Sequence, residues 1–129
     1  MSQNAGNPTG FETARLIVRC AEEADADAYK ALFAARGITV ADPLGLIALR
    51  KEAFAARTEF AFVAIIKDSN KFIGSIIIDN VNEDGAVSEG ELGYWLLGPF
   101  QRHGYMTEAL EGLNEYATST LRLKRLYGK

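Results

Sequence analysis

The sequence predicts a mixed α/β domain in which helices cover both faces of a single sheet. Apolar residues recur at helical spacing in three segments, and five other segments alternate with the period of a strand or form short apolar runs. These segments follow one another as strand, two helices, three strands, helix and strand. This order indicates antiparallel pairing of the first four strands, with the last helix linking the fourth and fifth strands in a right-handed parallel crossover.

Each predicted element begins or ends at a local signal. The first helix has acidic residues in its first turn and ends at Gly37, and Asp42-Pro43 supplies a cap and a first-turn proline for the second helix. The middle strands are rich in aromatic and β-branched residues. The expected order is a flexible lead-in (1–10), followed in a single domain (11–129) by strands at 15–20, 60–67, 72–79, 91–97 and 121–127 and helices at 22–35, 43–57 and 105–119.

Composition argues against several classes of protein. The chain has 129 residues and a formal net charge of −3, and an isoelectric point near 5.2 argues against a general nucleic-acid binder. Its longest apolar runs are far too short to span a bilayer, and residues 1–10 lack the pattern of a secretory signal. Cys20 is the only cysteine, which fits a reducing compartment. We therefore expect a cytoplasmic protein with no nucleic-acid or membrane partner.

The clearest functional signal lies where the strand at 91–97 gives way to the helix at 105–119. Gly98 and Pro99 break the strand, and a short polar loop leads to Gly104 at the start of the helix. The first N–H groups of a helix have no intrahelical partner, and the helix dipole adds partial positive charge, so this position favours a phosphate. An ordinary strand-to-helix connection has the same spacing and is the better interpretation on spacing alone. The other segments of the chain, in their order, favour phosphate binding.

Two motifs in this order resemble a known family. The loop follows a strand reading Glu-Leu-Gly-Tyr-Trp-Leu, and the two motifs are Gln101-x-x-Gly104-x-Met106 in the loop and Phe11-x-Thr13-x-Arg15-Leu16-x-x-Arg19 at the start. Together they resemble the GCN5-related N-acetyltransferase (GNAT) superfamily, and within it the branch that includes the ribosomal-protein N-terminal acetyltransferases. The resemblance extends from Phe11 to the end of the chain and implies a GNAT-like fold.

The resemblance implies that the protein moves an acetyl group from acetyl-CoA, its co-substrate, to a primary amine on a protein N-terminus or a small molecule. In this family the loop holds the pyrophosphate through backbone N–H groups, to which Thr107 would add a hydroxyl. Backbone groups at the end of the strand bind the pantetheine arm and polarise the thioester carbonyl. The implied cofactor-binding residues are Trp95, Leu96, Leu97, Gln101, Arg102, His103, Gly104, Tyr105, Met106 and Thr107.

Glu91 is the candidate general base. A carboxylate beside Leu92 and Trp95 would have a raised pKa and accept the proton of the amine, directly or through water. Glu89 carries the same charge, and Glu91 is preferred because the family places a glutamate before a Leu-Gly-Tyr run. His103 is the only histidine, so we expect no metal site.

The chain departs from the family pattern in two ways. Met106 stands where relatives usually have Gly or Ala, which allows binding when its side chain turns into the core. The chain also ends at Lys129, where relatives continue with further strands and a helix, so a C-terminal truncation is expected. Leu121, Leu123 and Leu126 would then lack part of their apolar cover. We therefore expect marginal stability, with a frayed C-terminus or a homodimer formed through this edge strand.

The proton donor for the departing CoA thiolate has no counterpart in the sequence pattern. Relatives supply a Tyr or Ser from later elements, and neither Tyr105 nor Tyr116 matches that position. A second interpretation is therefore a catalytically incomplete acyl-CoA-binding module, and a third is a domain completed by self-association. Turnover with a panel of amines separates the first two interpretations, and the molecular mass in solution tests the third.

Overall fold

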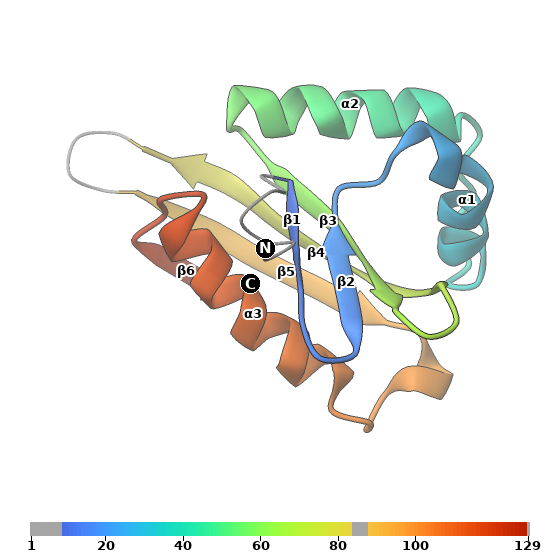
Figure 1. Ribbon diagram of the computed structural model, residues 1–129. Coiled ribbons are helices and arrows are strands. Elements are labelled where there is room, and N and C mark those ends of the chain that lie inside the picture. Colours follow the sequence, from blue (N-terminus) through green and yellow to red (C-terminus); the bar gives the residue numbers. More distant parts are fainter. Residues whose placement is uncertain (1–8, 84–87, 129) are drawn as a thin grey trace.

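The fold is a six-stranded mixed sheet with three α-helices, shown in Figure 1. The structure is a computed structural model, and it describes residues 9–83 and 88–128. Its elements are β1 (Gly10–Glu12), β2 (Leu16–Arg19), the 3-10 helix η1 (Glu23–Asp25), α1 (Ala26–Ala34), α2 (Pro43–Ala56), β3 (Phe60–Ile66), β4 (Lys71–Asn82), β5 (Glu89–Leu96), the 3-10 helix η2 (Gly98–Phe100), α3 (Tyr105–Ser119) and β6 (Arg125–Gly128). The strands lie in chain order and pair antiparallel, except β5 and β6, which are parallel. The predicted mixed sheet is confirmed.

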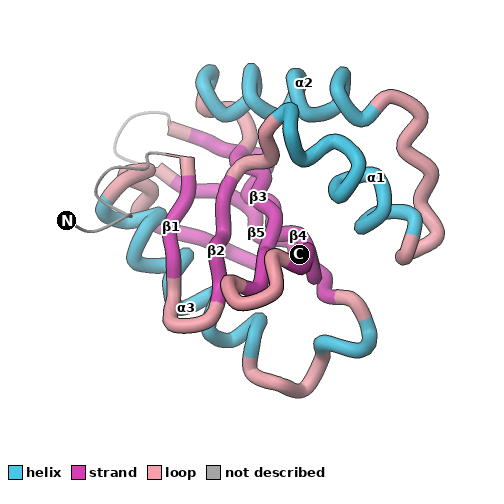
Figure 2. The backbone as a smooth tube through the Cα atoms, turned by 45° about the vertical axis from the view of Figure 1, so that its right-hand side comes forward, coloured by secondary structure: helices cyan, strands magenta, loops and turns pink. Residues whose placement is uncertain are grey.

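The helices cover both faces of the sheet, as predicted. α1 and α2 lie together on one side of the sheet and α3 lies on the other (Figures 1 and 2). Because side chains alternate along a strand, β3 contributes to both layers. Phe60 and Phe62 pack in the cluster under α3, whereas Val63 and Ile65 pack with α1 and α2. The sheet is therefore buried between two apolar clusters, each supplied by one set of alternating side chains.

The local signals act as the sequence indicates. Asp42 caps α2 by accepting a hydrogen bond from the N–H of Gly45 at 3.0 Å, and Pro43 occupies the first turn. Gly37 follows α1 with a φ of 84°, a left-handed conformation that glycine adopts at little cost. α3 covers the predicted range, Tyr105–Ser119. Helix ends that depend on a cap or a glycine are therefore readable from a few residues.

The N-terminal segment differs from the prediction. Instead of a single strand at 15–20, the chain forms a hairpin of β1 and β2. Phe11 in β1 is 2% exposed, and its ring centroid lies 5.3 Å from that of Tyr116 in α3. A partner strand and a helix far along the chain therefore hold β1 in place. Three residues are too few to show a periodic pattern, so the sequence does not reveal this strand.

Several predicted boundaries also shift. α1 begins at Ala26 after η1 rather than at residue 22, and β5 begins at Glu89 rather than at residue 91. Within the lead-in predicted at 1–10, residues 1–8 lie outside the described residues, and Gly10 already belongs to β1. β4 runs on to Asn82, three residues beyond the end of the strand predicted at 72–79. Pairing with β5 continues to this point, because Asn82 lies opposite Glu89 after a shift in register.

The expectation that the C-terminal leucines lack apolar cover is wrong. β6 begins only at Arg125, and the connection from α3 turns inward. Leu121 and Leu123 are 3% and 2% exposed and belong to the cluster under α3, and Leu126 packs partly against it. The N–H groups of Leu121 and Leu123 donate to carbonyls of the last turns of α3 at 3.1 and 2.9 Å. The connection itself therefore fills the core at the end of the helix.

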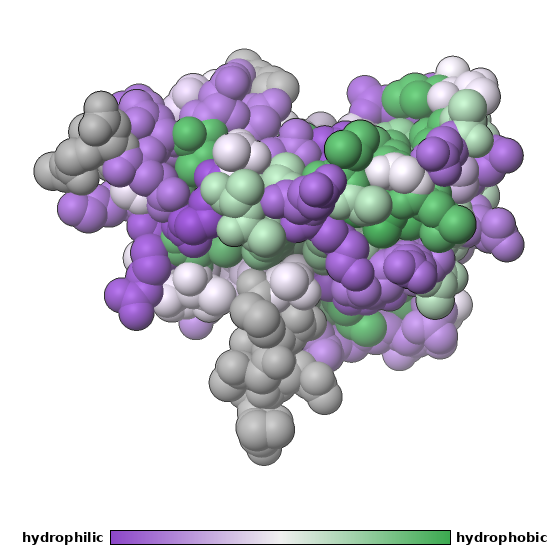
Figure 3. Space-filling view, turned by 90° about the horizontal axis from the view of Figure 1, so that it is seen from above, coloured by the Kyte–Doolittle hydropathy of each residue, from purple (hydrophilic) through white to green (hydrophobic). Residues whose placement is uncertain are grey.

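The surface over α2 is mixed in character. Figure 3 looks down on this side of the molecule and shows apolar patches separated by hydrophilic side chains. Leu44 and Leu49 of α2 are 52% and 63% exposed, and Ile38 in the preceding connection is 43% exposed. Over residues 9–83 and 88–128, no helix combines the length and the hydrophobicity that crossing a bilayer requires.

Candidate functional site

Two residues with positive φ turn the chain from β5 into α3. Arg102 has a φ of 66° and Gly104 a φ of 78°. Gly104 is the N-cap of α3, and its cap has no side-chain hydrogen bond. The N–H of Glu108 donates to the carbonyl of Gly104 at 3.0 Å, and the N–H groups of residues 105–107 precede any intrahelical acceptor. The helix therefore begins with available donors and partial positive charge, which favours an anion.

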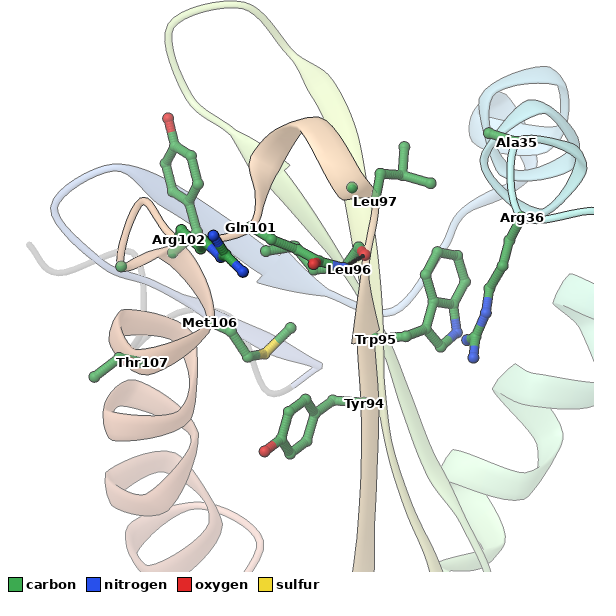
Figure 4. A pocket seen from close by; sticks show the side chains of 13 residues that line it. Ala35, Arg36, Tyr94, Trp95, Leu96, Leu97, Gln101, Arg102, Met106 and Thr107 are labelled. Atoms are coloured by element: carbon green, nitrogen blue, oxygen red, sulfur yellow. Dashed lines mark hydrogen bonds between the residues drawn. The ribbon is translucent and has the colours of Figure 1, made fainter.

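A cavity of about 660 Å³ lies between the second half of β5 and the start of α3 (Figure 4). This volume falls in the range of small-molecule and cofactor sites. The walls come from the end of α1, from β5, from the loop and from the first turn of α3. They include every residue predicted to bind the cofactor except His103. The lining residues are Ala35, Arg36, Tyr94, Trp95, Leu96, Leu97, Gly98, Gln101, Arg102, Gly104, Tyr105, Met106 and Thr107.

The edge of β5 that faces this cavity has no described partner strand. Pairing with β6 extends along β5 only as far as Leu92. The N–H of Leu97 donates to the carbonyl of Ile73 in β4 at 2.8 Å. Because backbone groups alternate in direction along a strand, those of Tyr94 and Leu96 point away from β4 and toward the cavity. A short stretch of main chain with hydrogen-bonding groups therefore forms part of the wall.

The backbone positions differ in detail from those predicted. Among the three residues expected to offer their main chain, Leu96 points outward, and its carbonyl accepts a hydrogen bond from the side chain of Gln101 at 3.0 Å. The groups of Trp95 and Leu97 point toward β4, where the Trp95 carbonyl closely approaches the backbone of Gly74. Tyr94 takes the second outward position. Tyr94 was not among the residues predicted to bind through their main chain, although the alternation of the strand indicates this position.

Trp95 and Arg36 together form one wall of the cavity. The guanidinium carbon of Arg36 lies 4.7 Å from the centre of the Trp95 ring, and Phe33 meets that ring edge-on at 5.4 Å. Figure 4 shows the two side chains next to each other. Among the described residues, Arg36 and Arg102 are the only charged side chains that line the cavity, so its charge suits an anionic ligand. A single arginine after a helix belongs to no motif, so the sequence could not reveal Arg36.

A second cavity of about 470 Å³ adjoins the first along β5. The two cavities share Arg36, Tyr94 and Trp95. The rest of the second cavity comes from β4, from Leu92 and Gly93 of β5, and from the end of β6. The exposed end of β5 is therefore bordered by two neighbouring cavities, which share the Trp95–Arg36 wall.

Glu91, the predicted base, lies in the first half of β5 and lines neither cavity. Its carboxylate accepts a hydrogen bond from the side-chain amide of Asn80 at 2.5 Å. Gly93, two residues further along the same face of the strand, lines the second cavity. The neighbouring Glu89 forms an ion pair with Arg125 at 3.8 Å. Glu91 is therefore near the second cavity along the strand but separate from the loop.

The other predicted groups divide between the surface, the cavity and the core. His103 is exposed, and its carbonyl accepts a hydrogen bond from Nη1 of Arg15 at 3.0 Å. Tyr105 lines the cavity, whereas Tyr116 is 4% exposed in the core, where burial raises the pKa of its hydroxyl. Met106 lines the cavity and also packs against the core cluster.

The turn between β1 and β2 contacts the loop and the first turn of α3. The carboxylate of Glu108 accepts hydrogen bonds from the hydroxyl of Thr13, from the N–H of Arg15 at 2.9 Å and from Nε of Arg15 at 2.8 Å. The Arg15 guanidinium also lies over the ring of Tyr105, 4.3 Å from its centroid. Burial acts to raise the pKa of Glu108, but these hydrogen bonds outweigh it and hold the pKa below its ordinary value. The sequence gives no sign of this role for Glu108.

Comparisons with known proteins agree with this architecture. A family model described as an acetyltransferase (GNAT) domain matches residues 15–129. The ribosomal-protein-S5-alanine acetyltransferase from Vibrio fischeri is similar in structure, with a TM-score of 0.79 and 20% identity over 92% of this chain and 72% of that chain. RimJ from Mycobacterium smegmatis, solved in complex with CoA-disulfide, is similar with a TM-score of 0.72 and 19% identity, over 88% of this chain and 61% of that chain. The microcin C7 self-immunity acetyltransferase MccE, solved with acetyl-CoA and AMP, is similar with a TM-score of 0.77 and 16% identity, over 93% of this chain and 72% of that chain.

These findings differ in what they establish. A search of curated proteins gave no significant match to this sequence. The similarities to solved structures, at 20% identity or less, establish the fold. The family match spans nearly the whole chain and includes the loop, the end of β5 and the start of α3 that together enclose the first cavity. The chain therefore belongs to the acetyltransferase (GNAT) domain family.

Proposed function

We propose that this protein transfers an acetyl group from acetyl-CoA to a primary amine, and that the first cavity is the cofactor site. The observation that carries this proposal is that the outward main chain of Tyr94 and Leu96, which pairs with no strand of the described residues, meets the start of α3 in one cavity. The similar structures of RimJ and MccE, which contain CoA-disulfide and acetyl-CoA, support the choice of cofactor.

Acetyl-CoA has a strongly anionic end and an extended arm, and the cavity offers a matching region for each. The pyrophosphate binds at the N–H groups of residues 105–107, near the positive charge of Arg102. The pantetheine amides bond to the outward main chain of Tyr94 and Leu96, as an added strand would. The hydroxyl of Thr107 and the side chain of Gln101 lie on the lining and add polar contacts.

The amine enters through the second cavity, on the other side of the Trp95–Arg36 wall. Its nitrogen attacks the thioester carbonyl, the carbon–sulfur bond breaks and CoA leaves as the thiolate. Glu91 accepts the proton of the amine through water, since Gly93 rather than Glu91 lines this cavity. The acceptor is a protein N-terminus or a small-molecule amine, and a panel containing both kinds identifies it.

The proposal is tested by titrating acetyl-CoA into the wild-type protein and Gly104→Val in a calorimeter. A branched side chain at a φ of 78° strains the backbone at the N-cap, and its Cβ would lie 3.4 Å from Nη2 of Arg15. This strain would displace the N–H groups that a phosphate must approach. We expect the affinity for acetyl-CoA to fall about tenfold or more.

The matched control is Asn70→Val in the turn between β3 and β4, where φ is 58°. It places the same side chain in a similar backbone conformation at a residue that does not line the cavity, and should leave the affinity unchanged. Equal binding by the wild-type protein and a folded Gly104→Val variant would show that the cofactor binds elsewhere.

A second candidate function is an acyl-CoA-binding module without turnover. The position of Glu91, outside both cavities, favours this alternative. The two functions differ in one measurement, the release of free CoA thiol in the presence of amines. Tight acetyl-CoA binding without thiol release from any amine in the panel would select the binding module.

A further inference from the structure

We propose that Thr13 and Arg15 are positioning residues that hold the phosphate-binding loop and the first turn of α3 in their binding geometry, by fixing Glu108. We call the three side chains the Glu108 clamp. The inference rests on the proposed function, because it assigns the clamp a role in acetyl-CoA binding. It adds a set of residues that lie outside the cavity.

Arg15 reaches three parts of the turn at once. Its Nε donates to Glu108 at 2.8 Å and its Nη1 donates to the carbonyl of His103 at 3.0 Å. Its guanidinium carbon lies 4.3 Å from the centre of the Tyr105 ring. One planar fork therefore spans the last loop residue before the N-cap and the first turn of the helix. A lysine could not reproduce this, because it presents a single ammonium instead of a planar fork.

The loop is exposed directly before α3, where Arg15 supports it. Arg102, His103 and Gly104 are exposed, and the first and last of these have positive φ. The N-cap Gly104 has no side chain with which to cap α3. Among the described residues, the carbonyl of His103 is bound by Arg15. Arg15 thus fixes the residue before the N-cap through its carbonyl and leaves the first N–H groups of α3 available.

The clamp also controls the charge beside the cavity. A carboxylate in the first turn of a helix interacts favourably with the dipole, and it would repel a phosphate that bound to the same helix end. Thr13 and Arg15 hold the Glu108 carboxylate toward the hairpin through hydrogen bonds, and the Arg15 guanidinium balances its negative charge in an ion pair. The N–H groups of residues 105–107 then remain available to an external anion. An unpaired Glu108 would compete with the cofactor.

The alternative is that the clamp stabilises the fold and has no effect on binding. The chain offers a matched control for this possibility in Arg19 and Asp25. Arg19 lies on β2 and binds Asp25 through Nη1 at 2.6 Å and Nη2 at 3.1 Å. This arginine–carboxylate pair starts from the same hairpin as Arg15. Neither Arg19 nor Asp25 lines the first cavity.

The experiment compares Arg15→Gln, Thr13→Val and Arg19→Gln with the wild-type protein. For each protein we would measure urea unfolding, the affinity for acetyl-CoA by calorimetry, and amide hydrogen exchange of residues 101–108 without ligand. We expect Arg15→Gln to weaken acetyl-CoA binding about tenfold and Thr13→Val to weaken it severalfold. Exchange in the loop should accelerate in both. Arg19→Gln should lose stability without a change in affinity or in loop exchange.

A double variant adds a readout that a purely structural role would not move. Adding Glu108→Gln to Arg15→Gln removes the unpaired charge, so part of the lost affinity should return although one more hydrogen-bonding group has been altered. Arg15→Lys keeps the charge but loses the fork, and its affinity should fall between those of the wild-type protein and Arg15→Gln.

The results separate this inference from the proposed function. If the wild-type protein binds acetyl-CoA and a folded Arg15→Gln binds it equally well, the clamp has no role in binding and the inference fails alone. If the wild-type protein does not bind acetyl-CoA, the proposed function fails and takes the binding role of the clamp with it. In either case, unchanged loop exchange in Arg15→Gln would show that the clamp does not position the loop at all.

Discussion

Glu108 illustrates how strongly a single side chain depends on distant parts of the chain. In the sequence it is one of 17 acidic residues and lies in no recognisable motif. In the structure it accepts hydrogen bonds from two residues that precede it by more than 90 positions. Sequence spacing describes neighbours along a strand or a helix, so it identifies the loop but not the residues that hold the loop. Arg36 could not be predicted from the sequence for the same reason.

At the scale of single residues, we predict that Glu91→Gln lowers turnover and leaves the affinity for acetyl-CoA unchanged. Glutamine keeps the size of the side chain but cannot accept a proton from the amine. A positioned base contributes about 10² to 10⁴ in rate, and a base that acts through water should lie at the lower end of that range. Steady-state kinetics over a range of pH, together with calorimetry, measures both effects.

Glu89→Gln is the control for this prediction, because Glu89 lies on the same strand and carries the same charge. Its ion pair with Arg125 is long, at 3.8 Å, so the substitution should be mild. A Glu91→Gln enzyme with the turnover and pH profile of the wild-type protein would exclude Glu91 as the base.

At the scale of elements, the sequence predicts best where a local signal marks an end. α3 covers the predicted range, and α2 begins at the Asp42-Pro43 cap. The sequence predicts least where a short element depends on contacts from far away, as in β1, which pairs with β2 and packs against α3. The first cavity follows the same rule: the loop and the start of α3 are local and were predicted, whereas Arg36 comes from a different part of the chain and required the assembled fold.

The contact between α3 and β1 leads to a second prediction, for Gly112→Ala. A methyl group at this position would lie 2.6 Å from Cε2 of the buried Phe11 ring and 3.1 Å from Cγ2 of Thr13. Alanine favours a helix by about 1 kcal/mol over glycine, but such crowding costs about 1–3 kcal/mol. We expect a net loss of unfolding free energy in urea.

Asn114→Ala provides the comparison, because it improves helix propensity at an exposed position of the same helix. It should be neutral or slightly stabilising. If Gly112→Ala is as stable as Asn114→Ala, then β1 yields easily and does not fix the position of α3.

At the scale of the whole molecule, the sheet lies between two apolar clusters, and the segment after α3 belongs to one of them. The expected loss of apolar cover at Leu121 and Leu123 does not occur. The sequence shows apolar residues in this segment but not the left-handed Arg122, with a φ of 63°, that lies between the two leucines. A strand pattern and an inward-turning connection look alike in a few residues.

We predict that Leu123→Ala lowers the unfolding free energy by about 2–5 kcal/mol, as for other buried leucines. Leu49→Ala, at a position that is 63% exposed, should change it by no more than about 0.5 kcal/mol. Urea unfolding measures both, and the amides of Leu121 and Leu123 should be protected from hydrogen exchange in a monomeric sample. Equal effects of the two substitutions would remove the C-terminal connection from the core.

The outward-facing main chain of Tyr94 and Leu96 has an evolutionary consequence. Every amino acid supplies the same N–H and carbonyl groups, so a wall made of backbone tolerates the replacement of almost any side chain on it, provided that the strand survives. Selection then conserves the path of the backbone more strongly than the amino-acid sequence. This tolerance is consistent with a fold that superimposes on a Vibrio fischeri acetyltransferase at a TM-score of 0.79 while only 20% of the residues agree. The differences between such proteins should accordingly lie in the side chains that line the cavity, such as that of Arg36.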